Sequence, residues 1–209
     1  MKLYYKPGAC SLAAHIVLCE IGARFALEKV DTAAGRTESG EDFGRISPNG
    51  YVPALKIDSG QVITENPAVL QYLTDLVPDR QLAPPAGTIE RVRLQEALNF
   101  ISSGLHKSFG PFFSGRELSV DARASAEAQV ARRVGHIEAR LADGRSYLLG
   151  EDFSVADAYA FVVLNWAGFV GIDLGRWPST QAYVARVRAR PATVSAMVRE
   201  GLVEAEAAQ

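Results

Sequence analysis

The segment Tyr4–His15 constrains the fold most, because it predicts a strand, a sharp turn and a helix in immediate succession. Aromatic residues typical of strands open the segment, and Pro7-Gly8 breaks the strand. From Cys10 to Ile21, apolar residues recur at helical spacing. The chain is therefore expected to begin with an α/β unit in which Cys10 lies in the first turn of a helix.

The position of Cys10 indicates reactive chemistry. The first turn of a helix carries unpaired backbone N–H groups and the positive end of the helix dipole, and both favour an anion. A thiol placed there is biased toward the thiolate, which is the reactive form of cysteine. The alternative is that Cys10 is a small residue that fills the turn. His15 and Cys19, further along the same helix, are interpreted as structural.

Composition narrows the class of function. The chain has 209 residues, 48% of them hydrophobic, and a formal net charge of −2. That charge gives no electrostatic reason to expect a nucleic acid or an anionic membrane as a partner. The sequence has no run of about 20 uncharged apolar residues that could span a bilayer. We therefore expect packed cores and neither nucleic-acid nor membrane binding.

The cysteines and histidines predict a reducing compartment and no metal. Cys10 and Cys19 lie on one predicted helix, roughly 13 Å apart along its axis, which is too far for a disulfide. Free thiols, and a first strand with no signal-peptide pattern before it, predict the cytoplasm. The three histidines make no zinc-ligand pattern with the cysteines.

Residues 1–79 predict an α/β domain with the element order βαβαββα. A second strand is expected at 25–30 and a short irregular helix at 41–46. Strands at 54–57 and 61–64 are separated by a Ser-Gly turn, which predicts a hairpin.

The helix after this hairpin is expected to close the first domain. Asn66 is a good N-cap and Pro67 fits the first helical position, and the helix should end near Pro78. Residues 80–87 contain two prolines and a glycine and predict a linker.

Residues 88–209 predict an all-helical second domain. Helices are expected at 88–109, at 120–141, after Ser154, at 180–189 and at 192–202. Ser154-x-x-Asp157 resembles a capping box, and the helix that it opens is apolar all round and hence buried. We interpret both of these residues as folding residues. The first of the helices carries a polar stripe, made of Asn99, Ser103, His106 and Gly110.

Taken in this order, these features resemble the glutathione S-transferases. The features are the cysteine at the first helix, Val52-Pro53 before the third strand, Glu65-Asn66 before the third helix, and the helical domain with Ser154-x-x-Asp157. Lys6–Ser11, together with the polar stripe and Lys107, is similar to the bacterial beta class. The resemblance covers essentially the whole chain and implies a thioredoxin-like first domain, at residues 1–79, that binds glutathione.

The resemblance also implies roles for individual residues. Catalytic roles are implied for Cys10 beside the glutathione sulfur, for Ser11 and for His106. Val52 would pair with the cysteinyl backbone, Pro53 would be cis, and Glu65 and Asn66 would hold the γ-glutamyl ammonium and carboxylate. Asn99, Ser103, His106 and Lys107 would close the site from the helical domain, with some contributed by a partner subunit. The family usually has Ser at position 66 and Lys near Gly35, where Arg36 is the candidate substitute.

The implied activity is conjugation of the glutathione thiolate to electrophilic, mostly apolar small molecules, a detoxification reaction carried out by a homodimer. Glutathione is a co-substrate here, and no cofactor is implied. Phe109, Phe113 and Trp166 are candidates to line the apolar pocket. One alternative is thiol–disulfide chemistry through a Cys10 mixed disulfide, which a second glutathione would resolve because Ala13 occupies the position of a resolving cysteine. Another alternative is a non-catalytic binding module.

Overall fold

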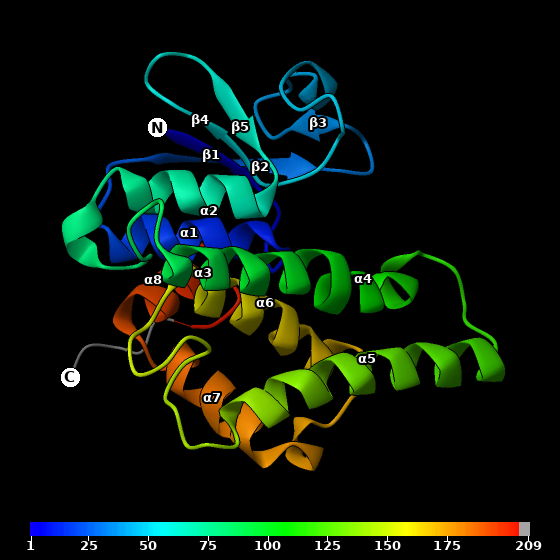
Figure 1. The fold of residues 1–209 in the computed structure, drawn as a ribbon. Coiled ribbons are helices and arrows are strands. Elements are labelled where there is room, and N and C mark those ends of the chain that lie inside the picture. The colour runs from blue at the N-terminus through cyan, green and yellow to red at the C-terminus, as the bar shows by residue number, and fades with distance from the viewer. Residues whose placement is uncertain (205–209) are drawn as a thin grey trace. The chain divides into compact units, whose positions relative to one another are not determined.

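The computed structural model describes residues 1–204, and contacts divide the chain into two units (Figure 1). The first unit is Met1–Ala83 together with the segment that begins at Ala189, and the second is Pro84–Arg188. The division falls inside the segment 80–87 that the sequence marks as a linker. The segment from Ala189 onward was expected in the helical domain, but its contacts group it with the first unit.

Within residues 1–204, the strands of the first unit form a five-stranded sheet in the order β3-β2-β1-β4-β5. The strands are β1 (Lys2–Tyr5), β2 (Ala26–Asp31), β3 (Arg36–Thr37), β4 (Ala54–Lys56) and β5 (Val62–Thr64). β1 and β2 are parallel, whereas β4 is antiparallel to both β1 and β5. The thioredoxin-like order of elements is therefore confirmed, with β3 as an additional edge strand.

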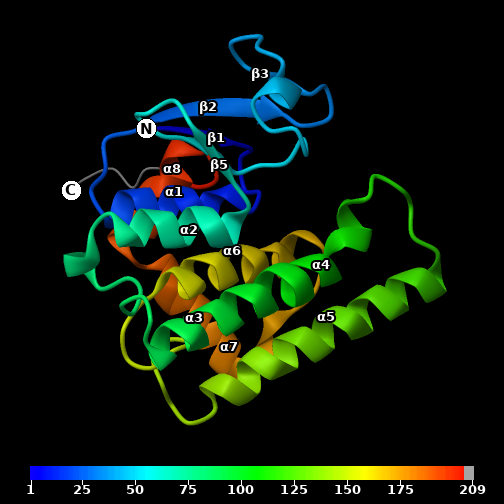
Figure 2. The ribbon, with the colours of Figure 1, turned by 45° about the horizontal axis from the view of Figure 1, so that its top comes forward.

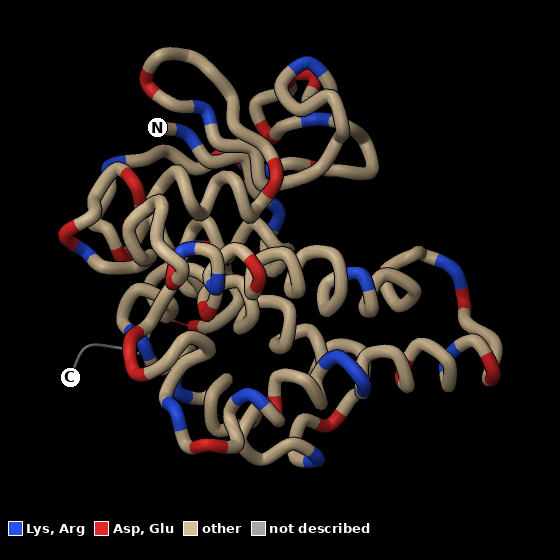
Figure 3. The backbone as a smooth tube through the Cα atoms, in the orientation of Figure 1, with Lys and Arg blue, Asp and Glu red and all other residues tan. Residues whose placement is uncertain are grey.

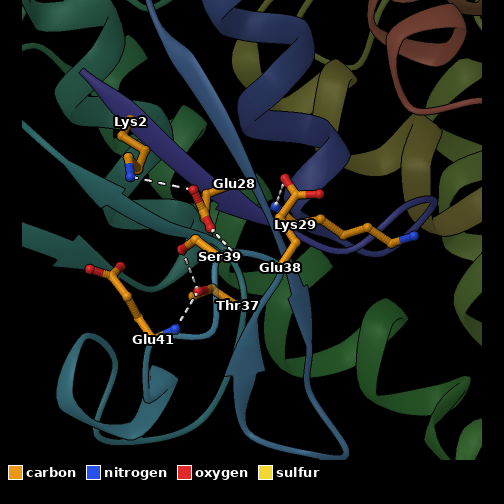
Figure 4. Close-up of polar contacts among 7 residues, drawn as sticks. All are labelled: Lys2, Glu28, Lys29, Thr37, Glu38, Ser39 and Glu41. Atoms are coloured by element: carbon orange, nitrogen blue, oxygen red, sulfur yellow. Dashed lines mark hydrogen bonds and ion pairs between the residues drawn. The ribbon is translucent and has the colours of Figure 1, made fainter.

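The segment around β3 is fixed by side chains of neighbouring strands, and Figure 4 shows these contacts. One oxygen of the Glu28 carboxylate accepts a hydrogen bond from the backbone N–H of Ser39 at 3.1 Å, and the other lies 3.4 Å from Lys2 Nζ. Hydrogen bonding from Ser39 is the main reason why the pKa of Glu28 is lowered. Thr37 Oγ1 accepts the backbone N–H of Glu41 at 3.0 Å. The expected short helix follows as a 3-10 turn, η1 (Phe43–Arg45).

Three helices of the first unit pack together. They are α1 (Ser11–Glu20), α2 (Asn66–Asp75) and α8 (Pro191–Arg199). α1 contacts β1, α2 and α8, and Figures 1 and 2 show α1 and α2 lying side by side under the sheet. Every residue from Ser11 to Leu18 is buried. A helix covered on several sides has no polar face, which explains why α1 is apolar nearly all round.

The first helical run of the second unit is interrupted, although the sequence predicted one helix at 88–109. It consists of α3 (Ile89–Asn99), a π-helical turn η3 (Phe100–Leu105) and α4 (His106–Ser108). The hydroxyl groups of Ser102 and Ser103 both donate to the carbonyl oxygen of Asn99, at 3.3 and 2.7 Å. Serine side chains compete with the backbone for such carbonyl oxygens, which favours a local departure from α-helical pairing at this junction.

The other helices of the second unit match the expected segments. They are α5 (Val120–Leu141), α6 (Val155–Phe169) and α7 (Pro178–Arg188). α5 has the predicted bounds, and Figure 3 shows positive and negative residues interleaved along it. α6 is buried along most of its length and contacts α3 and α7. Among residues 1–204, no helix combines the length and apolarity needed to cross a membrane.

Candidate active site

Cys10 occupies the expected position at the start of α1. It is the N-cap residue of the helix, and Gly8, with φ +70°, turns the chain from β1 toward it. The thiol of Cys10 donates a hydrogen bond to the backbone carbonyl oxygen of Val52 at 3.1 Å. The thiol is therefore directed at the segment that precedes β4.

The predicted thiolate character of Cys10 is wrong for this structure. Burial raises the pKa of the Cys10 thiol to about 12, although the backbone N–H groups of Cys10 and Ser11 act to lower it. The helix N-terminus therefore has the expected effect, but desolvation of the charged form is larger. A sequence pattern shows the helix start and not the depth of burial. At neutral pH the free protein keeps Cys10 protonated.

The segment from Val52 to Ala54 supplies the opposite wall of this region. The peptide bond Val52–Pro53 is cis, as the resemblance implied, and both residues are buried. Val52 packs with Tyr4, Phe43 and Ala54 in a core cluster on the sheet. This packing fixes the Val52 carbonyl group that accepts the Cys10 thiol.

The start of α2 differs by one residue from the sequence prediction. Glu65 is the N-cap, and Asn66 is the first helical residue. Glu65 has φ +65°, a left-handed conformation that is uncommon for a residue with a side chain, and it is exposed. Asn66 is buried, and its amide Nδ2 donates to the carbonyl oxygen of Cys10 at 2.8 Å. Its side chain therefore ties α2 to α1 instead of capping its own helix.

The first unit thus brings together Cys10, Val52 and Asn66 through hydrogen bonds, with Glu65 adjacent in sequence. Ser11 is buried, and its hydroxyl contacts the backbone N–H and carbonyl groups of Lys6 at 3.2 and 3.3 Å. Arg36 lies on β3, where its guanidinium donates to the carbonyl oxygen of Gly40 at 3.0 Å. The guanidinium of Arg36 is therefore bonded within its own turn, at a backbone carbonyl group four residues away.

In the second unit, His106 is the most perturbed of the predicted site residues. Its Nδ1 lies 2.8 Å from the hydroxyl oxygen of Tyr159 on α6. Burial, and secondarily the positive charge of Lys107, lower the pKa of His106 to about 4. The imidazole is therefore neutral at neutral pH. Sequence reasoning missed Tyr159, although a hydroxyl on an otherwise apolar buried helix signals a required partner.

Around His106 lies a group of aromatic rings, which we call the aromatic cluster: His106, Phe109, Phe113 and Trp166. The Trp166 ring centroid lies 4.8 Å from that of His106, 5.9 Å from that of Phe109 and 5.4 Å from that of Phe113. Phe109 is fully buried, whereas Phe113 is 54% exposed. The cluster therefore joins the core of this unit to its surface.

The other predicted polar residues of the second unit lie along the same helical run. Asn99, Ser103 and Lys107 are all exposed. Ser103 is engaged with the Asn99 carbonyl group, as described above, and Lys107 acts on the pKa of His106. The polar stripe is thus present on this run.

Two family models match the chain: "Glutathione S-transferase, N-terminal domain" at residues 8–76 and "Glutathione S-transferase, C-terminal domain" at residues 100–191. The chain is also 42% identical to glutathione S-transferase GstA of Escherichia coli O157:H7, over 97% of this chain and 100% of that protein. The chain belongs to the glutathione S-transferase family. Cys10, Val52 and Asn66 of this transferase fall within the N-terminal match, and the aromatic cluster falls within the C-terminal match.

Solved structures support this assignment and the resemblance to the beta class. The bacterial beta class glutathione S-transferase of Sphingomonas chungbukensis is 46% identical, with a TM-score of 0.93 over 97% of this chain and 100% of that one. A sphingomonad glutathione S-transferase complexed with glutathione is also 46% identical, with a TM-score of 0.92 over 97% and 100% of the two chains. These likenesses cover nearly all of the transferase described here.

Proposed function

We propose that this glutathione S-transferase conjugates the thiolate of glutathione to electrophilic, mostly apolar small molecules. The observation that carries the proposal is the convergence of Cys10, Val52 and Asn66 in the first unit, next to an exposed Glu65. The sphingomonad relative complexed with glutathione supports the same ligand.

The start of α2 suits the γ-glutamyl end of glutathione. The exposed carboxylate of Glu65 can accept hydrogen bonds from an ammonium group. The N-terminal N–H groups of α2 favour a carboxylate, because they are unpaired and lie at the positive end of the helix dipole. The start of α2 can therefore bind both the ammonium and the carboxylate of one amino-acid group.

Cys10 is assigned the role of a hydrogen-bond donor in conjugation. A thiol whose pKa is about 12 keeps its proton at neutral pH and is a poor nucleophile. The attacking sulfur therefore belongs to glutathione, and the protein positions it and polarises it. The backbone N–H groups at the start of α1 are suited to stabilise the negative sulfur.

The aromatic cluster is assigned to the second substrate. Phe113 is exposed and packs edge-on against the buried ring of Trp166. Rings of this kind contribute large apolar contact areas to ligand sites. His106 is neutral, so it adds a polar group without a charge that would repel an apolar molecule.

A steady-state comparison tests the proposal against thiol–disulfide chemistry and against simple binding. One assay follows glutathione with 1-chloro-2,4-dinitrobenzene, and the other follows reduction of a glutathione mixed disulfide. We expect conjugation to be saturable in both substrates and to be the faster activity. Disulfide reduction without conjugation would establish the alternative chemistry. Glutathione binding without either activity would establish a non-catalytic module.

The proposed assembly is a homodimer, in which α2 and α3 contribute to the interface. Ile89 and Val92 are exposed apolar residues on the first turn of α3, with exposed fractions of 59% and 44%. Two-fold dimers are the commonest assemblies of such chains. Sedimentation at micromolar concentration should give twice 22.5 kDa, and a monomer would contradict the assembly. The free cysteines Cys10 and Cys19 fit a reducing compartment, and we propose the cytoplasm.

A further inference from the structure

Cys19 lies in a cluster of ionisable residues that the proposed transferase chemistry does not use. Cys19 and His15 are four residues apart on α1 and hence on one face of the helix. His15 is fully buried, while Cys19 is half-buried and is a free thiol. The cysteine and the histidine that the sequence led us to interpret as structural therefore lie one helical turn apart.

The imidazole of His15 is held in place by a buried carboxylate. His15 Nδ1 lies 2.9 Å from Glu200 Oε1, and both side chains are inaccessible to solvent. The other oxygen of Glu200 accepts the backbone N–H of Gly8 at 2.9 Å. His15 Nε2 is buried and has no hydrogen-bond partner within residues 1–204. Nε2 is therefore the imidazole nitrogen that is available to Cys19, because Nδ1 is bonded to Glu200.

Arg199 adds a second positive charge to this cluster. Its guanidinium carbon lies 4.5 Å from the ring centroid of Phe25, and the Phe25 ring packs edge-on against His15 at 5.5 Å. Arg199 is exposed, and it acts together with His15 to lower the pKa of Cys19. A buried imidazole and an exposed guanidinium therefore both act on the Cys19 thiol.

These neighbours affect the protonation of both Cys19 and His15. Burial acts to raise the pKa of Cys19, but His15 and Arg199 together lower it below its ordinary value. Burial acts to lower the pKa of His15, but the nearby Cys19 and the Glu200 carboxylate raise it above its ordinary value. The negative end of the α1 dipole opposes a thiolate at this position, so the two cations must outweigh it. The arrangement of cysteine, histidine and carboxylate is the one that activates a nucleophile.

We propose that Cys19 is a reactive thiol and a modification site for small disulfides, of which glutathione disulfide is one. The Cys19 thiolate attacks one sulfur of the disulfide, so that its S–S bond breaks and a new S–S bond to Cys19 forms. The displaced thiolate takes up the proton that Cys19 released. Cys19 is oxidised and half of the small disulfide is reduced, so no other oxidant is needed. Cys19 lies roughly 13 Å along α1 from Cys10, which makes this a separate site.

The test uses the exchange rate of Cys19 in a Cys10→Ala background, in which Cys19 is the sole cysteine. The probe is 2,2′-dithiodipyridine, an uncharged disulfide, at pH 6. Arg199→Gln removes the exposed cation, and Arg176→Gln is the matched control, because Arg176 is also exposed and stacked on an aromatic ring, that of Trp177. Loss of this cation lowers the thiolate fraction, and higher intrinsic nucleophilicity offsets part of that loss, so a slowing of about threefold is expected for Arg199→Gln. Arg176→Gln should leave the rate unchanged.

Two further measurements complete the test. Glu200→Gln should also slow the exchange, because a neutral amide at position 200 no longer stabilises the positive imidazole of His15. Circular dichroism verifies that this variant folds. Mass spectrometry of the wild-type protein with glutathione disulfide should give an adduct on the peptide that contains Cys19. Equal rates for Arg199→Gln and Arg176→Gln, or no adduct on that peptide, would overturn the proposal.

Discussion

Replacement of Asp157 by alanine should destabilise the second unit far more than loss of an ordinary helix cap. The Asp157 carboxylate is buried and accepts hydrogen bonds from the N–H and hydroxyl groups of Ser154, each at 2.8 Å. Its other oxygen accepts the N–H of Leu148 at 2.8 Å and the hydroxyl of Tyr183 at 3.0 Å. One side chain therefore connects the start of α6 to the preceding loop and to α7.

The expected loss in the free energy of unfolding depends on which hydrogen-bond acceptors remain for each donor in the Asp157→Ala variant. The Leu148 N–H is left buried without its acceptor, which costs about 2 kcal/mol. Loss of the cap at Ser154 adds about 1 kcal/mol. The Tyr183 hydroxyl keeps an alternative acceptor, since the backbone carbonyl oxygen of Asp157 lies 3.3 Å away. We therefore expect about 3 kcal/mol for Asp157→Ala, and about 1 kcal/mol for Ser154→Ala.

Urea unfolding followed by tryptophan fluorescence measures this difference, because both tryptophans, Trp166 and Trp177, belong to the second unit. The shift in midpoint multiplied by the slope gives the change in the free energy of unfolding. Ser154→Ala is the matched control for the cap alone. If the two variants lose the same stability, the contacts of Asp157 beyond the cap contribute nothing and the reasoning fails.

Other predictions concern binding and pH dependence. Glu65→Gln should weaken glutathione binding about tenfold in calorimetry, since it removes a charge-assisted hydrogen bond at an exposed position. The control is Glu90→Gln, a change in the first turn of α3, which should leave the affinity unaltered. The pKa of His106 is about 4 in the folded protein, whereas the ordinary value for the unfolded chain is 6.5. Between pH 4 and pH 6.5, His106 is therefore protonated in the unfolded chain but neutral in the folded protein. Stability is therefore lost as the pH falls from 6.5 toward 4, by up to about 3 kcal/mol, and His106→Gln should abolish that part of the pH dependence of urea unfolding.

Local patterns in the sequence predicted the elements whose signals are contained in a few neighbouring residues. α5 has the predicted bounds because Ser119 caps it and its apolar residues keep a helical period to Leu141. The box at Ser154 and Asp157 was also predicted correctly, since its spacing is local. The same reasoning placed Cys10 at the start of α1.

Features that depend on distant segments could not be predicted. The raised pKa of Cys10 comes from burial, and the Val52 carbonyl group that accepts its thiol lies 42 residues away in sequence. Asn66 was expected to cap α2, but Glu65 occupies the cap position, and the Asn66 amide donates to the Cys10 carbonyl group, 56 residues away in sequence. Glu200 lies 185 residues from His15, so their contact has no local signal.

In the proposed reaction the attacking sulfur belongs to glutathione and not to the protein. The most direct measurement uses the Cys10→Ala/Cys19→Ser variant, which contains no thiol of its own. Addition of glutathione at neutral pH should produce the ultraviolet absorption of a thiolate, and the variant should retain conjugation with 1-chloro-2,4-dinitrobenzene at a moderately reduced rate. A folded, glutathione-binding variant that shows neither thiolate absorption nor conjugation would instead make a protein thiol a direct participant in transfer.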